Sequence, residues 1–371
     1  MKIDEIEVIP IRVPNRVPMK LSTMLLESQE NVIVRIRAGD VAGIGETEPI
    51  SGFQGCAETQ ATIVPMIRGR FAPLILGRDP FDIETIARDM ENSIWGNPYA
   101  KSAVINALYD LKAKQLRLPL FQLLGGCYRD RIAVVWTIGI KDSKQMAAEA
   151  RWAVEQGYRL LKMKIGAAAP EADVQNIAVI RDAVGPGIGL RVDANGALGF
   201  TQALKLLEQL KRFNLDLVEQ PLAIADLDGM ARLIELTGIP IMPDESLHSL
   251  QSALELVKKR AASIFGMKLA KHGGIYFAQK IAAIAQAANL PIYPGNQPGT
   301  SVGSATAAHF YAATWNATLG GDFNVGPTGW LADDIVKKPL SVSDGYAFVP
   351  QGAGIGVELD ESKLAKYTVE I

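Results

Sequence analysis

Cysteine is scarce in this sequence, and its scarcity bears on where the chain works. Only two cysteines, Cys56 and Cys127, occur in 371 residues. A disulfide framework is therefore not expected, and a reducing compartment is favoured. The first residues alternate apolar and polar side chains and lack the long apolar core of a signal peptide. We expect a cytoplasmic protein.

Long apolar runs and an excess of one charge are also missing. No stretch approaches the roughly 20 uninterrupted apolar residues that cross a membrane. The formal net charge of −2 leaves no basic footprint for nucleic acid or an anionic membrane. The composition, 48% hydrophobic and 21% charged, is typical of a soluble globular protein. We therefore expect neither a nucleic-acid nor a membrane partner.

Histidine is the third scarce residue, with only three in the chain. His248 is expected to open a helix and His309 to lie within one, so the two do not form a plausible catalytic pair. His272 and its neighbour Lys271 are expected at the surface of a loop. A mechanism based on histidine is therefore not supported.

The central part of the chain repeats one pattern at intervals of about 24 to 29 residues. Apolar stretches end in charged residues: LKMKIG with Lys162 and Lys164, LRVDANG with Asp193, LVEQPL with Glu219, IMPDES with Asp244, and FGMKLAKHGG with Lys268. One strand, one helix and two loops need about 25 to 30 residues. The pattern predicts an α/β protein, a (β/α) barrel with its chemistry at the carboxyl ends of the strands.

The flanking segments predict a second structural unit. Three antiparallel strands are expected at residues 3–13, 31–38 and 41–48, with loops at 14–24 and 50–56 and helices near 57–69, 80–92 and 98–117. Further barrel strands are expected at 132–139, 290–294 and 318–323, and a hairpin or loop after residue 339. We therefore expect an α+β capping domain over residues 1–125, a barrel over 126–333, and a segment 334–371 that returns to the cap.

Three acids should meet at the barrel mouth. Asp193, Glu219 and Asp244 end successive strands, whose carboxyl ends lie together in a barrel. Three adjacent carboxylates cannot all stay ionised without a cation, and ligation by oxygen alone favours Mg²⁺, with Mn²⁺ as a substitute. The alternative is that each acid is a solvated strand end or a helix cap.

Three lysines accompany the acids. Lys162 and Lys164 are two residues apart on one strand, so both point to the barrel interior. Lys268 should approach from across the barrel. Burial and mutual repulsion are expected to lower the pKa of at least one lysine toward a value suited to a general base. A metal ion would then hold a substrate carboxylate while a lysine moves the α-proton. The alternative is that the lysines are simple counter-ions of the acids.

The pocket wall is expected to come from a glycine-rich loop and from the cap. Residues 293–303 read YPGNQPGTSVG and lead into a helix, whose N-terminal N–H groups could hold a substrate carboxylate. Asn296 and Gln297 are candidate donors there, and an ordinary turn is the alternative. The cap loops around Met19 and Phe53 are expected to set specificity for a small carboxylate substrate.

With these residues placed, the chain resembles the muconate lactonizing enzyme subgroup of the enolase superfamily. The resemblance rests on Lys162-Met163-Lys164, the Asp193/Glu219/Asp244 triplet, Asp244-Glu245-Ser246 and residues 268–274. It implies a modified (β/α)₇β barrel under an α+β cap, with the three acids as Mg²⁺ ligands. It also implies that Lys164 and Lys268 form an opposed acid/base pair assisted by Lys162. We further expect a homo-oligomer.

Several reactions occur within that subgroup. Dipeptide epimerases carry Asp-x-Asp where this chain has Asp322-Phe323-Asn324, and anti-lactonizing enzymes carry a glutamate that residues 298–301 lack. Residues 295–297 resemble syn-lactonizing enzymes, so we expect a muconate-type cycloisomerase. The alternatives are a dipeptide epimerase, an N-succinylamino acid racemase, an o-succinylbenzoate synthase or a related racemase or dehydratase. Outside the family, a Schiff-base lysine enzyme and a non-catalytic barrel stay open.

Overall fold

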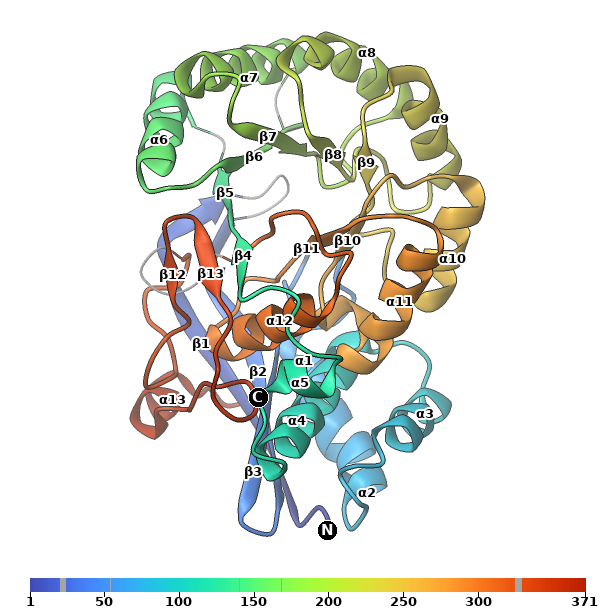
Figure 1. Ribbon diagram of the computed structural model, residues 1–371, viewed down its shortest axis with the longest axis vertical. Coiled ribbons are helices and arrows are strands. Elements are labelled where there is room, and N and C mark those ends of the chain that lie inside the picture. The colour runs from blue at the N-terminus through green and yellow to red at the C-terminus, as the bar shows by residue number, and fades with distance from the viewer. Residues whose placement is uncertain (21–24, 54, 140, 168, 324–328) are drawn as a thin grey trace.

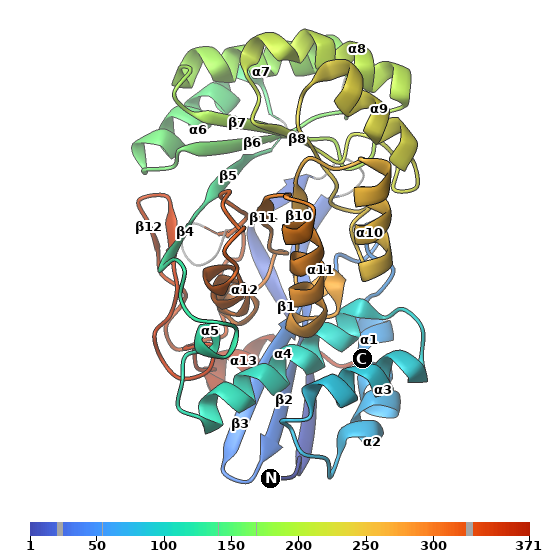
Figure 2. The same cartoon turned by 45° about the vertical axis from the view of Figure 1, so that its right-hand side comes forward.

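A three-stranded antiparallel sheet and a ring of parallel strands form the two halves of this computed structural model (Figure 1). The structure describes residues 1–20, 25–53, 55–139, 141–167, 169–323 and 329–371, and only the backbone of residues 19 and 20. Helices surround the parallel strands on the outside, and the antiparallel sheet lies with its own helices below them (Figure 2). The arrangement confirms the α/β barrel with an α+β cap.

The cap sheet has the order β1-β2-β3. Its strands are β1 (Glu5–Lys20), β2 (Leu25–Ala38) and β3 (Val41–Thr47), followed by helices α1 (Gln60–Met66), α2 (Ala72–Ile75), α3 (Ile83–Ser93), α4 (Pro98–Gln115) and α5 (Leu120–Leu123). A π-helical turn over Ile67–Phe71 joins α1 to α2. The helices at 57–69, 80–92 and 98–117 were thus expected nearly where they occur.

The first strand is longer than the sequence indicates. A loop was expected over residues 14–24, but β1 continues to Lys20, with a register shift between Pro14 and Met19. The extension contacts a segment that follows the barrel: the N–H of Arg16 donates to the carbonyl of Trp330, and Asn15 forms a bridge with Leu331. A partner so distant in sequence leaves no local signal. Of the expected loop, residues 21–24 lie outside the described residues.

The barrel strands run parallel in the order β5-β6-β7-β8-β9, and β10 pairs with β11. Their bounds are β5 (Val135–Ile138), β6 (Leu160–Lys164), β7 (Gly189–Asp193), β8 (Leu217–Glu219), β9 (Ile241–Met242), β10 (Phe265–Met267) and β11 (Ile292–Pro294). The helices between and after them are α6 (Ser143–Glu155), α7 (Pro170–Val184), α8 (Phe200–Leu210), α9 (Leu227–Thr237), α10 (Leu250–Lys259), α11 (Ile275–Ala287) and α12 (Ser301–Ala313). Short 3₁₀ turns lie at Lys211–Phe213 and Ala270–His272.

Single backbone hydrogen bonds close the ring. The N–H of Gly266 donates to the carbonyl of Pro243, which joins β10 to the end of β9. The strand expected at 318–323 is not regular: Gly321 makes an isolated bridge with Val134, and the N–H of Asp322 donates to Pro294. A Cβ atom at Gly321 would lie 1.7 Å from the Pro294 carbonyl oxygen. This close approach requires glycine at position 321. Glycine is a poor strand former, which explains why the segment is not a regular strand.

The strand expected at 132–139 serves two sheets. Its first part, β4 (Arg131–Ala133), pairs with β13 (Tyr346–Phe348), which forms the expected hairpin with β12 (Val342–Ser343). Its second part, β5, belongs to the barrel. After α13 (Glu361–Tyr367), Thr368 bridges to Ile11 of β1, so the chain ends against the cap sheet. The division at residues 125 and 333 stays a prediction.

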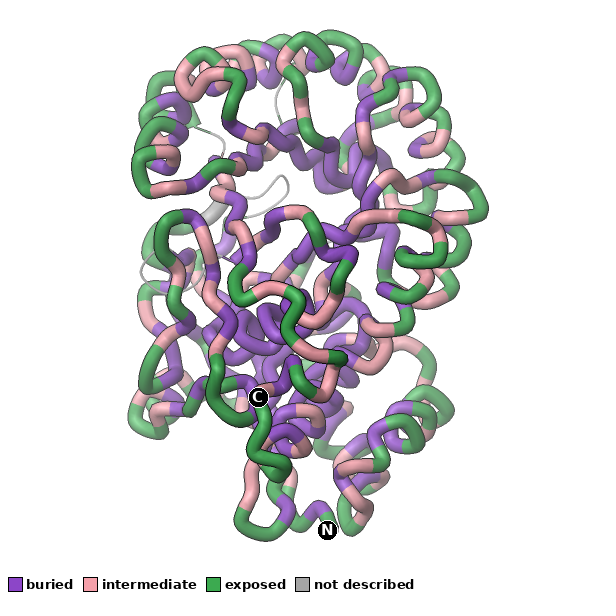
Figure 3. The backbone as a smooth tube through the Cα atoms, viewed as in Figure 1, coloured by how far each residue is buried: buried purple, intermediate pink, exposed green. Residues whose placement is uncertain are grey.

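Burial separates the two halves into two main cores. One apolar cluster fills the barrel and its helices, and another lies between the cap sheet and helices α1 to α4. Buried stretches line the strands, and exposed residues alternate along the outer helices (Figure 3). Within the described residues, no helix is both long and apolar enough to span a membrane.

We expect Gly45→Ala to destabilise the cap. Strand β3 lies directly on α4, and a Cβ atom at Gly45 would be 2.2 Å from the carbonyl oxygen of Ala103. Overpacking of this kind costs about 1–3 kcal/mol in the free energy of unfolding. Gly187→Ala is the matched control, because nothing lies within 4 Å of its Cβ position. Equal urea midpoints for the two variants would contradict the close packing.

Candidate active site

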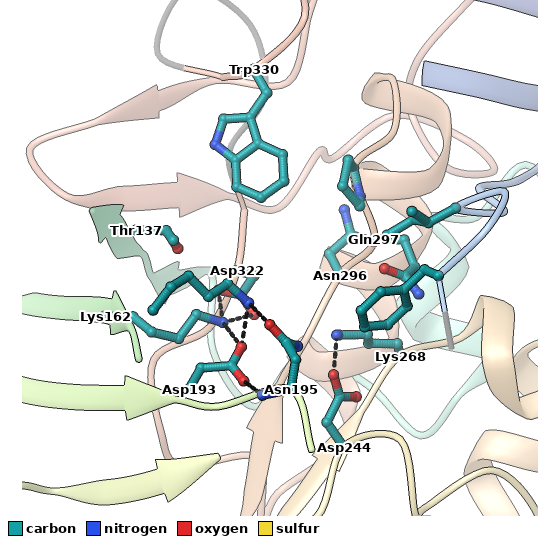
Figure 4. A pocket seen from close by; sticks show the side chains of 14 residues that line it. Thr137, Lys162, Asp193, Asn195, Asp244, Lys268, Asn296, Gln297, Asp322 and Trp330 are labelled. Carbon is teal, nitrogen blue, oxygen red and sulfur yellow. Dashed lines mark hydrogen bonds and ion pairs between the residues drawn. The ribbon is translucent and has the colours of Figure 1, made fainter. Parts of the chain in front are cut away.

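A pocket of about 660 Å³ opens at the carboxyl ends of the barrel strands. Its walls come from both halves of the molecule and bring together most of the residues expected from the sequence (Figure 4). The lining residues are Ile50, Phe53, Thr137, Lys162, Lys164, Asp193, Asn195, Asp244, Lys268, Asn296, Gln297, Pro298, Asp322 and Trp330. Phe53 thus carries the cap loop to the lysines. The side chain of Met19 lies outside the described residues.

The strand register places the charges side by side. Lys164 pairs with Asp193 between β6 and β7, and Asp193 pairs with Glu219 between β7 and β8. Glu219 is 1% exposed and lies below the pocket lining, whereas Asp193 and Asp244 reach the pocket itself. Parallel strands in register bring their carboxyl ends to one edge, so the three acids form one buried cluster.

Each expected lysine is paired with one of these acids. The Nζ atom of Lys164 lies 2.5 Å from Asp193 Oδ2, and that of Lys268 lies 2.5 Å from Asp244 Oδ2. Lys162 Nζ donates to Glu219 Oε2 at 3.0 Å and lies 3.0 Å from Asp322 Oδ1. Lys164 is the last residue of β6, and Lys268 directly follows β10; Figure 4 shows Lys268 beside Asp244.

The pKa values reflect crowded charge. Burial, reinforced by the neighbouring Asp193 carboxylate, raises the pKa of Glu219 to about 8. Burial would raise the pKa of Asp244 as well, but Lys268 and Lys271 hold it well below its usual range. Burial would lower the pKa of Lys162 and of Lys268, yet the facing carboxylates raise both. The expectation of a lowered lysine pKa is therefore wrong for these two residues.

The donor set suits a hard divalent cation. Among the described residues, no group of three His, Cys, Asp or Glu side chains is arranged so that it could hold a metal ion. The three acids instead form ion pairs with lysine ammonium groups. The acids nonetheless offer only carboxylate oxygens, the ligands that Mg²⁺ and Mn²⁺ favour. Five buried or half-buried carboxylates (Asp193, Glu219, Asp244, Glu245, Asp322) meet four ammonium groups (Lys162, Lys164, Lys268, Lys271). One further positive charge would relieve the excess.

Lys271 corrects an expectation drawn from the sequence. It was expected at the surface, but it is 4% exposed in the 3₁₀ turn Ala270–His272, and neighbouring His272 is buried too. Its Nζ atom donates to Asp244 Oδ1, to the Asp244 carbonyl at 2.5 Å and to the Gly266 carbonyl at 3.0 Å. The turn thus directs Lys271 toward Asp244 and Gly266, which the polar sequence KHGG did not indicate.

The N-terminus of α12 also differs from expectation. Its N–H groups were expected to bind a substrate carboxylate, but protein carboxylates already occupy them. Glu46 of β3 accepts from the N–H groups of Thr300 and Gly303, and Asp334 accepts from that of Ser301. Glu46 is 1% exposed. The anion site of the helix therefore joins the cap to the barrel, and it is closed to a substrate.

Several pocket residues escaped the sequence reasoning. Asn195 accepts from Lys164 Nζ at 2.8 Å and donates to Glu245 Oε1 at 3.0 Å, so it links a lysine to a fourth carboxylate. Its position two residues after Asp193, at a strand end, was the available signal. Thr137 and Trp330 also face the pocket (Figure 4). They gave no signal, because nothing local shows which loop residues turn inward.

We expect Lys271→Met to destabilise the protein by about 3–5 kcal/mol, since it leaves the buried Asp244 carboxylate without one of its partners. Urea unfolding of the metal-free protein measures the loss. The control is Lys259→Met, which breaks a lysine–aspartate pair of similar length at the surface, with Asp228. That variant should unfold close to the wild-type midpoint. A Lys271→Met protein as stable as this control would show that the buried pair is unimportant.

Comparison with known proteins identifies the family. A family model described as "Mandelate racemase / muconate lactonizing enzyme, N-terminal domain" matches residues 4–125, and one described as "Enolase C-terminal domain-like" matches residues 145–363. The chloromuconate cycloisomerase CbnB of Cupriavidus necator is 36% identical over 99% of both chains.

Solved structures agree. The 2-chloromuconate cycloisomerase of Rhodococcus opacus 1CP superimposes with a TM-score of 0.95 at 33% identity, covering 100% of both chains. The muconate lactonizing enzyme of Pseudomonas fluorescens, complexed with muconolactone, also gives 0.95 at 34% identity over 99% of each chain. The chain belongs to the mandelate racemase/muconate lactonizing enzyme family of the enolase superfamily.

Proposed function

We propose that this protein is a metal-dependent cycloisomerase that lactonizes a muconate-type dicarboxylate. The relatives named above are chloromuconate and muconate cycloisomerases, aligned with this chain over nearly its whole length. The observation that carries the proposal is the pair Lys164 and Lys268, which approach one pocket from β6 and from the end of β10, each beside a buried acid. We propose Mg²⁺, with Mn²⁺ as a substitute, as the cation.

Asp193, Glu219 and Asp244 would hold the cation. All three are buried, and all offer carboxylate oxygens from the ends of neighbouring strands. When bound, the ion supplies positive charge for a substrate carboxylate and for the enolate formed beside it. The ion would also offset part of the negative charge of the carboxylates, which at present raises the pKa of Lys162 and Lys268.

The reaction needs one new bond and one proton. One carboxylate oxygen of the muconate adds to the double bond conjugated with the other carboxylate, and the displaced electron pair gives an enolate. A lysine ammonium beside the α-carbon delivers a proton there, and the neutral lysine regains a proton from solvent. We propose that Lys164 or Lys268 is this acid, and that the other stabilises the enolate by its charge.

Lys162 has a supporting role in this scheme. It is 4% exposed and lies between Glu219 and Asp322, so its charge offsets those of two acids. It lies two residues from Lys164 on β6, so both side chains are on the same face of the strand. Phe53, Ile50, Pro298 and Trp330 supply an apolar wall, which suits an unsaturated carbon chain. Asn296 and Gln297 provide the polar part of that wall.

The presence of two lysines at one pocket also favours a second candidate, a racemase or epimerase of the same family. One lysine would remove an α-proton and the other would return it on the opposite face. A Schiff-base enzyme is disfavoured, because it needs a lysine with a lowered pKa. Burial would lower the pKa of Lys268, but the charges of Asp244 and Glu219 outweigh burial and raise it. Incubation of the purified protein with muconate, chlorinated muconates, dipeptides and N-acylamino acids decides between these reactions. Turnover of amino-acid derivatives alone would reject the cycloisomerase.

We expect activity to vanish with a chelator and to return with Mg²⁺ or Mn²⁺. Glu219→Gln should weaken metal binding sharply, because it removes one of three anionic ligands while it keeps the shape of the side chain. Calorimetric titration of the metal-free protein with Mn²⁺ measures this binding directly. Glu208→Gln, on the exposed surface of α8, is the control. Full activity in excess chelator would show that the reaction does not require a metal ion.

Lys164→Ala and Lys268→Ala should each lower kcat. Loss of a general acid or base typically costs about 10²- to 10⁴-fold, and loss of an electrostatic partner costs less. The two variants should therefore differ, with the larger loss marking the proton donor. Steady-state assays on muconate provide the comparison. If both variants keep near-normal turnover, neither lysine takes part in the reaction.

A further inference from the structure

The two amides on the pocket wall are both held through their nitrogen atoms. Gln297 Nε2 donates to the hydroxyl of Tyr99 at 3.0 Å, and Asn296 Nδ2 donates to Ser304 Oγ at 2.8 Å. Both residues line the pocket next to Lys268 (Figure 4). An amide has donors on its nitrogen and acceptor capacity on its oxygen. One N–H of Gln297 is engaged by the protein, which holds the nitrogen end of the amide at Tyr99 and leaves its carbonyl oxygen for a ligand.

Tyr99 is itself fixed by the cap. It lies in the first turn of α4 and is 2% exposed. The carboxylate of Glu58 accepts from the N–H groups of Tyr99 and Ala100, at 2.8 and 3.1 Å. These bonds hold the start of α4, which carries Tyr99, against the cap residues that precede α1.

The Tyr99 hydroxyl lies close to the thiol of Cys56, which itself donates to the carbonyl of Glu58 at 3.2 Å. The lone pairs of the Tyr99 oxygen accept from Gln297 Nε2. Tyr99 thus meets the nitrogen end of the Gln297 amide, and the oxygen end is left for the pocket.

We propose that Tyr99 is a positioning residue that holds the carbonyl oxygen of Gln297 toward the substrate. A carboxylate beside that oxygen is repelled, whereas an N–H or O–H group gains a hydrogen bond. This wall therefore favours a substrate group that carries a donor, and it turns a second carboxylate away from Gln297. The proposal rests on the proposed function, in which a first carboxylate is held among the lysines and the cation.

The test compares two unreactive ligands on the Mg²⁺-loaded enzyme. Adipate, a saturated six-carbon dicarboxylate, and its monoamide differ only in whether the second end is a carboxylate or offers N–H donors. Calorimetry gives the Kd of each. Tyr99→Phe removes the hydroxyl and keeps the ring, so the Gln297 amide is free to turn. We expect the ratio of the two Kd values to shift toward the dicarboxylate by about 3- to 10-fold, the range for one hydrogen bond.

A second tyrosine of the same helix is the matched control. The hydroxyl of Tyr109 hydrogen-bonds Gln279 Oε1 of α11 at 3.2 Å, a tyrosine–glutamine contact between cap and barrel that lies outside the pocket. Tyr109→Phe should leave the Kd ratio unchanged. In a Gln297→Ala background, Tyr99→Phe should have no further effect on the ratio, because Tyr99 acts through Gln297.

Three results would overturn the proposal: an unchanged ratio in Tyr99→Phe, an equal shift in Tyr109→Phe, or a shift that persists without Gln297. Binding of these ligands needs no turnover, so an enzyme inactive on muconates that still shows the expected shift would reject the cycloisomerase and keep the positioning role. If neither ligand binds a wild-type enzyme that turns over muconate, the positioning role is rejected and the cycloisomerase stands.

Discussion

The structure depends on one electrostatic constraint, the gathering of nine charged side chains at the carboxyl ends of the barrel strands. Lys162, Lys164 and Asp193 share two neighbouring strands in register, and Glu219 and Asp244 follow on the next two. Separate burial of these groups would cost several kcal/mol for each ion. Their mutual pairing makes the burial tolerable, and the remaining excess of acid is what a divalent cation would neutralise.

The cap matters because the barrel alone does not complete the pocket. Ile50 and Phe53 reach over the lysines, and Glu46 binds the N-terminus of α12, so the loop that carries Asn296 and Gln297 is anchored by a cap strand. Tyr99 of the cap likewise accepts a hydrogen bond from Gln297 on the pocket wall.

The sequence predicted the parts of this molecule that repeat. Apolar stretches that end in charged residues at a regular spacing predict the barrel. The parallel topology then predicts that the acids and lysines at the strand ends lie close together. The sequence predicted that the tail returns to the cap and that the loop at Phe53 reaches the pocket, but it missed several other contacts between distant segments. The extension of β1 to Lys20, the burial of Lys271 and the closure of the α12 N-terminus by Glu46 all depend on partners far along the chain. The roles of the site residues, the domain limits, the cytoplasmic location and the homo-oligomer stay predictions.

The central claim is that metal and lysine together create an enolate next to a substrate carboxylate, and proton exchange tests it most directly. In muconolactone, the methylene beside the carboxylate carries the two hydrogens that such an enolate relates. The account predicts that the Mg²⁺-loaded enzyme in D₂O replaces one of them with deuterium, seen as the loss of one methylene signal by proton NMR, and that a chelator stops the exchange. Exchange that continues in the chelator, or no exchange with an enzyme that turns over muconate, would contradict it.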